Sequence, residues 1–314
     1  MSSSKQKIHL KGALGSSFSF SVSTVFNSSD RPFLLIFDSK EEAAYYLNDF
    51  EMLLDEKQVL FYPGSYRRPY HVEETDNANI LLRAEVLNRI NSQKKPALII
   101  TYPEALFEKV VSRTQLEKSI FKVSIGETLN LDFFNEVLFE YQFSRVDFVT
   151  EPGEFSVRGG IVDVFSFSHD EPYRIEFFGD EVESIRTFDI ETQLSTNTIK
   201  KIQILPNIEH KLLNQTRQSF FEYISSETLI FAKNISNLLE LTEKLQQKAR
   251  EAYDALTSEI NYSNPVDLFC TSANFKSQLL DFSVVEFGMN SILATNLSQK
   301  VEFQVGPQPS FNKQ

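Results

Sequence analysis

The stretch EPGEFSVRGGIVDVFSFSHDEPYRIEFFGDEVESIRTFD, from Glu151 to Asp189, decides the fold of the middle of this chain. A β-strand sends alternate side chains to opposite faces of its sheet. In YRIEFF, residues 173–178, one set of alternate positions is apolar throughout: Tyr173, Ile175 and Phe177. The other set carries two charges and one large aromatic ring: Arg174, Glu176 and Phe178. The stretch therefore predicts a small antiparallel sheet with an apolar inner face and an unusual outer face.

Phe178 has two interpretations at this point. If the apolar set faces the core, Phe178 projects to solvent beside charged side chains, which is the composition of a protein-binding hot spot. Alternatively, it is a hairpin-tip aromatic that folds back onto its own sheet. The following Gly179-Asp180 pair predicts a two-residue hairpin turn, because glycine adopts positive φ without strain. Gly159-Gly160 inside a strand pattern indicates either a bulge or a close approach of another backbone.

The segments before this stretch alternate short apolar runs with amphipathic patterns. Residues 32–38, 59–64 and 97–101 are apolar runs typical of buried parallel strands. Between them, residues 39–54 and 80–90 have helical spacing, with Ser39 as the expected N-cap. Strands that alternate with helices imply a doubly wound parallel α/β layer.

The segments after position 115 change character twice. Residues 131–141 predict one helix, and the strands of the opening stretch then follow with no helix between them, which indicates an α+β insert. From about 209 the α/β pattern returns. A strand pattern at 227–232 precedes a long helical stripe that ends near Leu256, and DLFC (267–270) and SVVEFG (283–288) are interpreted as further strands.

Composition narrows the classes of function. The net charge is -12 over 314 residues, which disfavours stand-alone DNA binding because that requires clustered Lys and Arg. No apolar run is long enough to span a membrane and no signal-peptide core is visible, so we expect a cytoplasmic protein without membrane contact. Cys270, the only cysteine, is expected to be a small buried hydrophobe. The four histidines lack partners at metal-ligand spacing, so no metal site is expected.

KGALGSSFSFS, residues 11–21, contains the glycines and hydroxyls of a phosphate loop. A working loop needs G-x-x-x-x-G-K-[ST], with Lys on the β and γ phosphates and the hydroxyl on magnesium. Four of the expected residues are present: Gly12, Gly15, Ser16 and Ser17. Ser17-Phe18 stands where the Lys belongs, and no acidic pair follows the strand at 97–101. The sequence therefore predicts a degenerate loop, equivalent to an ordinary Ser/Gly turn, and no cofactor or ATPase activity in this chain.

FYPGSYRRPYHVEETDNANI, residues 61–80, interleaves tyrosines with Arg67 and Arg68. Aromatic rings stack on bases and arginines pair with phosphates, so the composition is compatible with nucleic-acid binding. Two arginines are few, however, and an acidic run follows at once. A solvated loop is the favoured interpretation, and residual DNA contact through Arg67 and Arg68 stays open.

Two motifs carry a resemblance to a known family. PGEFSVRGGIVDVF (152–165) and YRIEFFGDEVESIRTFD (173–189) resemble domain 2 of the UvrB-like module that UvrB shares with bacterial transcription-repair coupling factors. The resemblance continues more weakly over nearly the whole chain. It implies an α/β fold: a degenerate helicase-like, P-loop NTPase-like parallel layer in two discontinuous halves with an inserted α+β domain. The implied domains are 1–115 (1A), 116–208 (2) and 209–314 (1B).

The resemblance also implies a function. In this family domain 2 docks UvrA, the damage-searching ATPase of nucleotide excision repair, and Arg158, Arg174 and Phe178 match positions that contact it. Glu176 and Asp180 are further candidates, because they can accept hydrogen bonds from basic groups of the partner. Arg158 has a structural alternative, in which it pins the sheet to an acid such as Asp163.

The degenerate phosphate loop and the short segment between Tyr70 and Ile80, where UvrB has a long DNA-clamping hairpin, favour the coupling-factor branch of the family. The resemblance then implies that the full protein is an ATP-driven DNA translocase that removes stalled RNA polymerase. Its sites for ATP, magnesium, DNA and RNA polymerase lie in regions absent from this chain, which is expected to be non-catalytic. The alternatives are an active UvrB-type ATPase that loads onto DNA and a structural domain without a partner.

Overall fold

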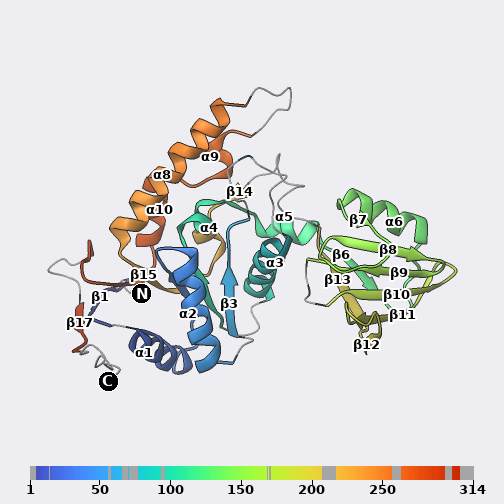
Figure 1. Ribbon diagram of the computed structural model, residues 1–314, viewed down its shortest axis with the longest axis horizontal. Helices are drawn as coiled ribbons and strands as arrows, with labels where there is room; N and C mark the ends of the chain where they lie inside the picture. The colour runs from blue at the N-terminus through green and yellow to red at the C-terminus, as the bar shows by residue number, and fades with distance from the viewer. Residues whose placement is uncertain are drawn as a thin grey trace, which may run out of the picture.

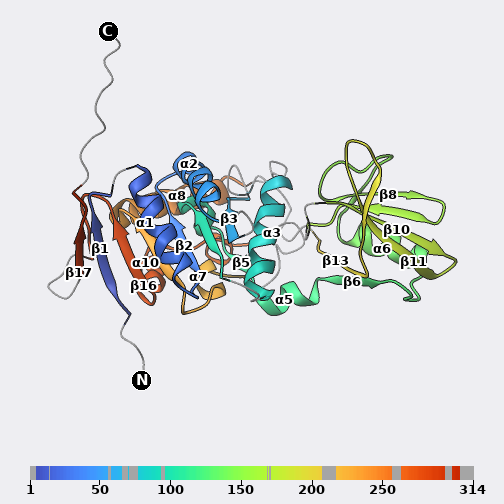
Figure 2. The same ribbon diagram turned by 90° about the horizontal axis from the view of Figure 1, so that it is seen from below.

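The computed structural model describes residues 5–13, 15–55, 58–65, 70, 77–92, 96–167, 169, 171–206, 217–256, 263–293 and 299–304. These residues form two bodies, a larger one around a seven-stranded sheet and a smaller one around a six-stranded sheet. Figures 1 and 2 both show the smaller body, drawn in green and yellow, to one side of the larger.

The large sheet is parallel throughout the described strands. In spatial order its strands are β17 (Gln299–Glu302), β1 (Lys7–Lys11), β16 (Ser283–Phe287), β15 (Leu229–Lys233), β2 (Phe33–Ile36), β4 (Leu98–Thr101) and β3 (Val59–Tyr62). Strands from the two ends of the chain therefore lie in one layer, with β1 inserted between β17 and β16. The α/β class and the parallel sheet expected from the sequence are confirmed.

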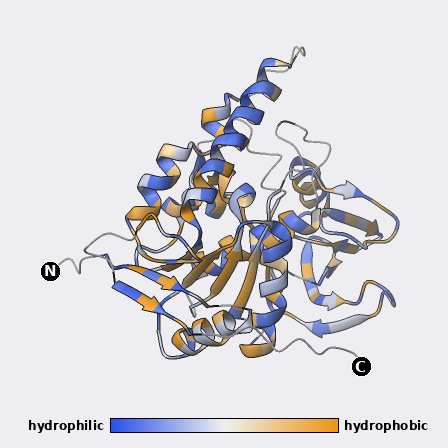
Figure 3. Cartoon of the chain, turned by 60° about the vertical axis from the view of Figure 1, so that its left-hand side comes forward, coloured by the Kyte–Doolittle hydropathy of each residue, from blue (hydrophilic) through white to orange (hydrophobic). Residues whose placement is uncertain are grey.

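The middle of this sheet is covered on both faces. Every residue of β2, β4 and β16 is buried, which explains why their sequences are continuous apolar runs rather than alternating ones. In Figure 3 the strands in the middle of this sheet are largely orange. The longer helices of this body are α1 (Ser16–Asn27), α2 (Lys40–Leu53), α3 (Asn77–Ser92), α8 (Ile235–Asp254) and α10 (Ser272–Leu280).

The helix start predicted from an N-cap residue is confirmed. Ser39 is the N-cap of α2, and its Oγ accepts a hydrogen bond from the backbone N–H of Glu42 at 3.3 Å, as predicted. The predicted stripe near 235–256 corresponds to α8, whose Leu238 and Ala249 are buried. Among the described residues, no helix combines the length and the apolarity needed to cross a bilayer.

One predicted strand is wrong. In DLFC, Asp267 and Leu268 belong to the helix α9 (Pro265–Leu268), and Phe269 makes only an isolated bridge to Glu108. Pro265 stands at the start of α9 and Asn264 caps it, and these start signals outweigh the short apolar run. The remaining short elements of the larger body are α4 (Pro103–Phe107), β5 (Val110–Val111), α5 (Arg113–Lys118), β14 (Arg217–Gln218) and α7 (Phe220–Tyr223).

The smaller body has its sheet strands in the order β12 (Ser195–Thr198), β11 (Glu181–Phe188), β10 (Tyr173–Phe178), β9 (Ile161–Val164), β8 (Glu154–Arg158) and β7 (Ser144–Arg145). β6 (Phe121–Ser124) and β13 (Lys201–Ile204) form a separate pair. The helix α6 (Leu131–Glu140) packs on the inner face, where the rings of Phe134 and Phe177 lie 6.0 Å apart. Tyr173, Ile175 and Phe177 are buried, as the alternation predicted.

Gly159-Gly160 is a turn, so the predicted bulge at this pair is wrong. Arg158 pairs with Ile161, which leaves the two glycines as the loop of the β8–β9 hairpin. The alternative, a close backbone approach, is confirmed: a Cβ on Gly160 would lie 2.8 Å from the carbonyl oxygen of Phe177. The register of this sheet shifts elsewhere: between Glu176 and Phe177 in the β10–β11 pairing, and between Arg186 and Phe188 in the β11–β12 pairing.

Candidate functional site

Phe178 lies at the outer end of the β10–β11 hairpin with 79% of its surface exposed. Gly179 has φ 62° and forms the two-residue turn with Asp180, as predicted. The turn is held in place, because the backbone N–H of Leu129 donates to the carbonyl of Asp180 at 2.7 Å and Asn130 Nδ2 donates to its carboxylate at 2.9 Å. A large apolar ring is thus presented to solvent on a rigid support. The interpretation in which the ring folds back onto its own sheet is wrong.

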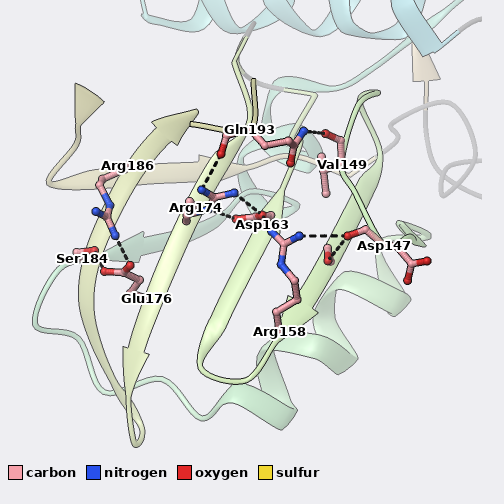
Figure 4. Close-up of polar contacts among 10 residues, drawn as sticks. Asp147, Val149, Arg158, Asp163, Arg174, Glu176, Ser184, Arg186 and Gln193 are labelled. Carbon is pink, nitrogen blue, oxygen red and sulfur yellow. Dashed lines mark hydrogen bonds and ion pairs between the residues drawn. The ribbon is translucent and has the colours of Figure 1, made fainter. Parts of the chain in front are cut away.

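Asp163 is the centre of the outer face. Only 1% of its side chain is exposed, and its carboxylate accepts two hydrogen bonds from Arg174, at 2.7 Å from Nε and 2.8 Å from Nη2. The Nη2 of Arg158 donates to the same carboxylate from the other side, as Figure 4 shows. One buried carboxylate therefore serves two guanidinium groups, and the structural role considered for Arg158 is present.

The two arginines differ in how much of them a partner can reach. Arg174 is only 15% exposed, donates to the carbonyl of Gln193 at 3.0 Å, and lies 4.6 Å over the ring of Phe188. The hydrogen bonds from Arg174 to Asp163 raise the pKa of the guanidinium above its usual value. Arg158 remains 42% exposed, beside the carbonyl of Asp147 at 3.3 Å. Arg174 therefore holds the carboxylate of Asp163 in place, whereas part of Arg158 is exposed to solvent and can contact a partner.

Glu176 is paired within the sheet. It forms an ion pair with Arg186 of β11 and accepts a hydrogen bond from the hydroxyl of Ser184 at 2.7 Å (Figure 4). The three arginines and two acids of this outer face carry one net positive charge. Beyond them, the end of the hairpin near Phe178 is acidic, since Asp180, Glu181 and Glu183 are all exposed there.

The sequence analysis missed two contributors to this face. Arg186 was detectable, because it shares the outward alternation of its strand and lies opposite Arg174 in the β10–β11 register. Phe148 carried no such signal, because it lies in the loop after β7, outside any periodic segment. Its ring is 62% exposed and lies 5.5 Å from the guanidinium of Arg158.

The four residues of the predicted degenerate phosphate loop lie after β1 and at the start of α1. Gly12 and Gly15 adopt positive φ, and Ser16 and Ser17 begin α1. A Cβ on Gly12 would lie 2.6 Å from the carbonyl oxygen of Phe303, so the chain after β17 passes directly against this loop. Phe18, near the place of the missing Lys, is fully buried and stacks on Phe287 at 4.2 Å. The side chain at this position therefore belongs to the aromatic core.

The remaining sites proposed from the sequence are less informative. Arg67 and Arg68 lie outside the described residues. Tyr70 is buried against Tyr253 and Phe269, so its ring is part of a core cluster. Within the described ranges, no group of three or more His, Cys, Asp or Glu side chains is arranged to hold a metal ion.

Cys270 is buried, as expected for a small hydrophobe, and burial raises the pKa of its thiol to about 12. Burial disfavours the charged thiolate, so the thiolate fraction near pH 8 is about a thousandfold smaller than for a solvated cysteine. We expect a disulfide reagent at pH 8 to label the native chain slowly and the urea-unfolded chain rapidly. Equal labelling rates in the two states would show that Cys270 is accessible.

Comparison with known proteins identifies the class of the smaller body. The family described as UvrB interaction domain matches residues 121–210, which include the strands from β6 to β13 and thus the whole outer face. The class of protein defined by this fold and this surface is therefore one that carries a UvrB interaction domain.

Relatives that match most of the chain identify its family. The transcription-repair-coupling factor of Bacillus subtilis is 30% identical over 218 residues, which are 69% of this chain and 18% of the relative. That of Rickettsia bellii is 29% identical over 263 residues, 80% of this chain and 23% of the relative. The chain belongs to the transcription-repair-coupling factor family, and it spans about a fifth of the length of these relatives. A UvrABC system protein B from Prochlorococcus marinus is 26% identical over 82% of the chain and 40% of its own length.

Proposed function

We propose that this chain recruits UvrA through the outer face of the β8–β11 sheet. The observation that carries the proposal is the exposed ring of Phe178 on a hairpin whose turn is hydrogen-bonded to residues 129–130. Exposed aromatic rings beside partly exposed arginines are the residues that dominate protein–protein binding energies. The match of residues 121–210 to a UvrB interaction domain supports the same function.

The residues proposed for this contact take different roles. Phe178 and Arg158 face the partner directly, and Asp180 offers exposed acceptors at the hairpin turn. Arg174 holds Asp163 and Arg158 in position, and Glu176 holds Arg186. A preorganised site of this kind loses little side-chain entropy on binding, which favours affinity.

The test is direct binding of purified UvrA to this chain, by calorimetry or biolayer interferometry. The expected result is saturable binding of UvrA to the chain. Absence of binding at micromolar UvrA would overturn the proposal and favour a structural domain without a partner.

The rest of the full-length activity belongs to the same proposal. The full protein would use ATP and magnesium elsewhere to translocate on DNA and displace stalled RNA polymerase, while this part recruits the excision machinery. The proposed domains are 1–115, 116–208 and 209–314, with the first and third forming a degenerate helicase-like layer and the second presenting the docking face.

The competing function is an active UvrB-type ATPase, which the similarity to a UvrABC system protein B makes worth testing. Because Phe18 fills the place of the missing Lys and Phe303 closes on Gly12, we expect no binding of ATP–magnesium at micromolar concentration in a fluorescence or calorimetric titration. Binding that disappears when Gly12 or Ser16 is substituted would establish the competing function.

A further inference from the structure

A groove runs along the β7–β8 edge of the small sheet, where β8 is separated by β9 from β10, the strand that carries Phe178. It lies between the segment 145–148, which follows β7, and residues 156–158 at the end of β8. β7 pairs with β8 only at Ser144 with Glu154 and Arg145 with Phe155. Within the described part of the chain, the last residues of β8 therefore have no neighbouring strand on this side.

The backbone of β8 presents hydrogen-bonding groups to this groove. In an antiparallel pair, the N–H and C=O of successive residues point alternately toward and away from the neighbouring strand. The carbonyl of Glu154 accepts from Phe165 on the β9 side, whereas that of Phe155 accepts from Val146 on the β7 side. By this alternation the N–H and C=O of Val157 point into the groove, where an added extended segment would meet them.

The side chains that line the groove carry one net positive charge, from Arg145 and Arg158 against Asp147. Asp163 is the one acid, among the described residues, in an ion pair with Arg158, and it is shared with Arg174. Arg145 lines the groove and is exposed, and the guanidinium of Arg158 lies 5.5 Å from the centre of the Phe148 ring. A carboxylate from outside would supply the negative charge that this cluster lacks.

Two regions of the outer face thus differ in charge. The tip of the β10–β11 hairpin, beside Phe178, is acidic through Asp180, Glu181 and Glu183, and the β7–β8 edge is basic through Arg145 and Arg158. We propose that the groove is a second contact site for the partner that docks at Phe178, and that it takes an extended, acidic segment of that partner. This inference rests on the proposed function, and opposite charges in the two regions would orient the partner across the strands of the sheet.

The test measures UvrA affinity for single variants of the intact chain. Phe148→Ala and Arg145→Gln are each expected to weaken binding about fivefold or more, with unchanged thermal midpoints because both side chains are exposed. Arg250→Gln, on an exposed position of α8, is the matched charge control and should bind as the unmodified chain does.

Two further variants separate contact from structure. Asp147→Asn removes a negative charge from the groove, where the carboxylate points away from Arg158 (Figure 4), so binding of an acidic segment should tighten about two- to fivefold. Val157→Pro removes the N–H that points into the groove and keeps the β8–β9 pairing, so binding should weaken. Because Val157 is half-buried against the core, Val157→Ala is the matched control: it loses the same packing, keeps the N–H and should bind more tightly than Val157→Pro.

A failure of the groove inference can be distinguished from a failure of the proposed function. If UvrA binds the chain and loses affinity with Phe178→Ala, but binds Phe148→Ala and Arg145→Gln unchanged, the groove is not a contact site and this inference is overturned. If UvrA does not bind the unmodified chain at all, the proposed function fails and the groove inference fails with it.

Discussion

Phe178→Ala is expected to weaken UvrA binding about thirtyfold. Truncation of a central aromatic anchor typically costs about 2 kcal/mol or more, and each 1.4 kcal/mol corresponds to a tenfold change in affinity. The ring is 79% exposed in the free chain, so its removal leaves the fold intact. The measurement is the dissociation constant of the UvrA complex, together with the thermal midpoint of each variant.

Phe20→Ala is the matched control for this experiment. Phe20 is also a largely exposed phenylalanine, but it lies on α1 in the larger body. It should bind UvrA with unchanged affinity, which would exclude a general effect of losing surface apolar area. Unchanged affinity for Phe178→Ala would remove the ring from the contact, whatever Phe20→Ala does.

Asp163→Ala is expected to destabilise the smaller body by about 3–5 kcal/mol. Removal of one partner of a buried ion pair leaves an uncompensated charge, and here the guanidinium of Arg174, only 15% exposed, would lose both hydrogen bonds to Asp163 and keep only the weaker electrostatic attraction of Glu176. The free energy of opening can be read from hydrogen exchange of the amides of β9 and β10. Amides of β2 and β4 in the larger body serve as the internal reference.

The variants around Asp163 test the cause of this loss. Asp163→Ala combined with Arg174→Ala should cost less than the sum of the two single changes, because the double variant no longer buries an unpaired charge. Arg186→Ala breaks the more exposed pair with Glu176 and is expected to cost no more than about 1 kcal/mol. Additive losses at Asp163 and Arg174 would contradict the shared-carboxylate arrangement.

Much of the fold was predictable because the signals were local. The helix that begins at Ser39 follows from its cap, and the turn at Gly179-Asp180 follows from the conformational freedom of glycine. DLFC was misassigned because a four-residue apolar run has no periodicity of its own, and the start signals at Asn264 and Pro265 decided the outcome. For Gly159-Gly160 the sequence left a bulge and a close backbone approach open, and only the register of β8 and β9 showed that the pair forms a turn.

The sequence by itself determined which face of β10 is apolar and that Phe178 stands on the other face. Side-chain alternation along a strand is a property of the backbone, so it needs no knowledge of the neighbours. Only the tertiary structure decided that Arg158 and Arg174 share one carboxylate, and that Phe148 lies beside Arg158. Those contacts join separate strands and a loop, and their geometry depends on strand register and loop path, which local patterns do not specify.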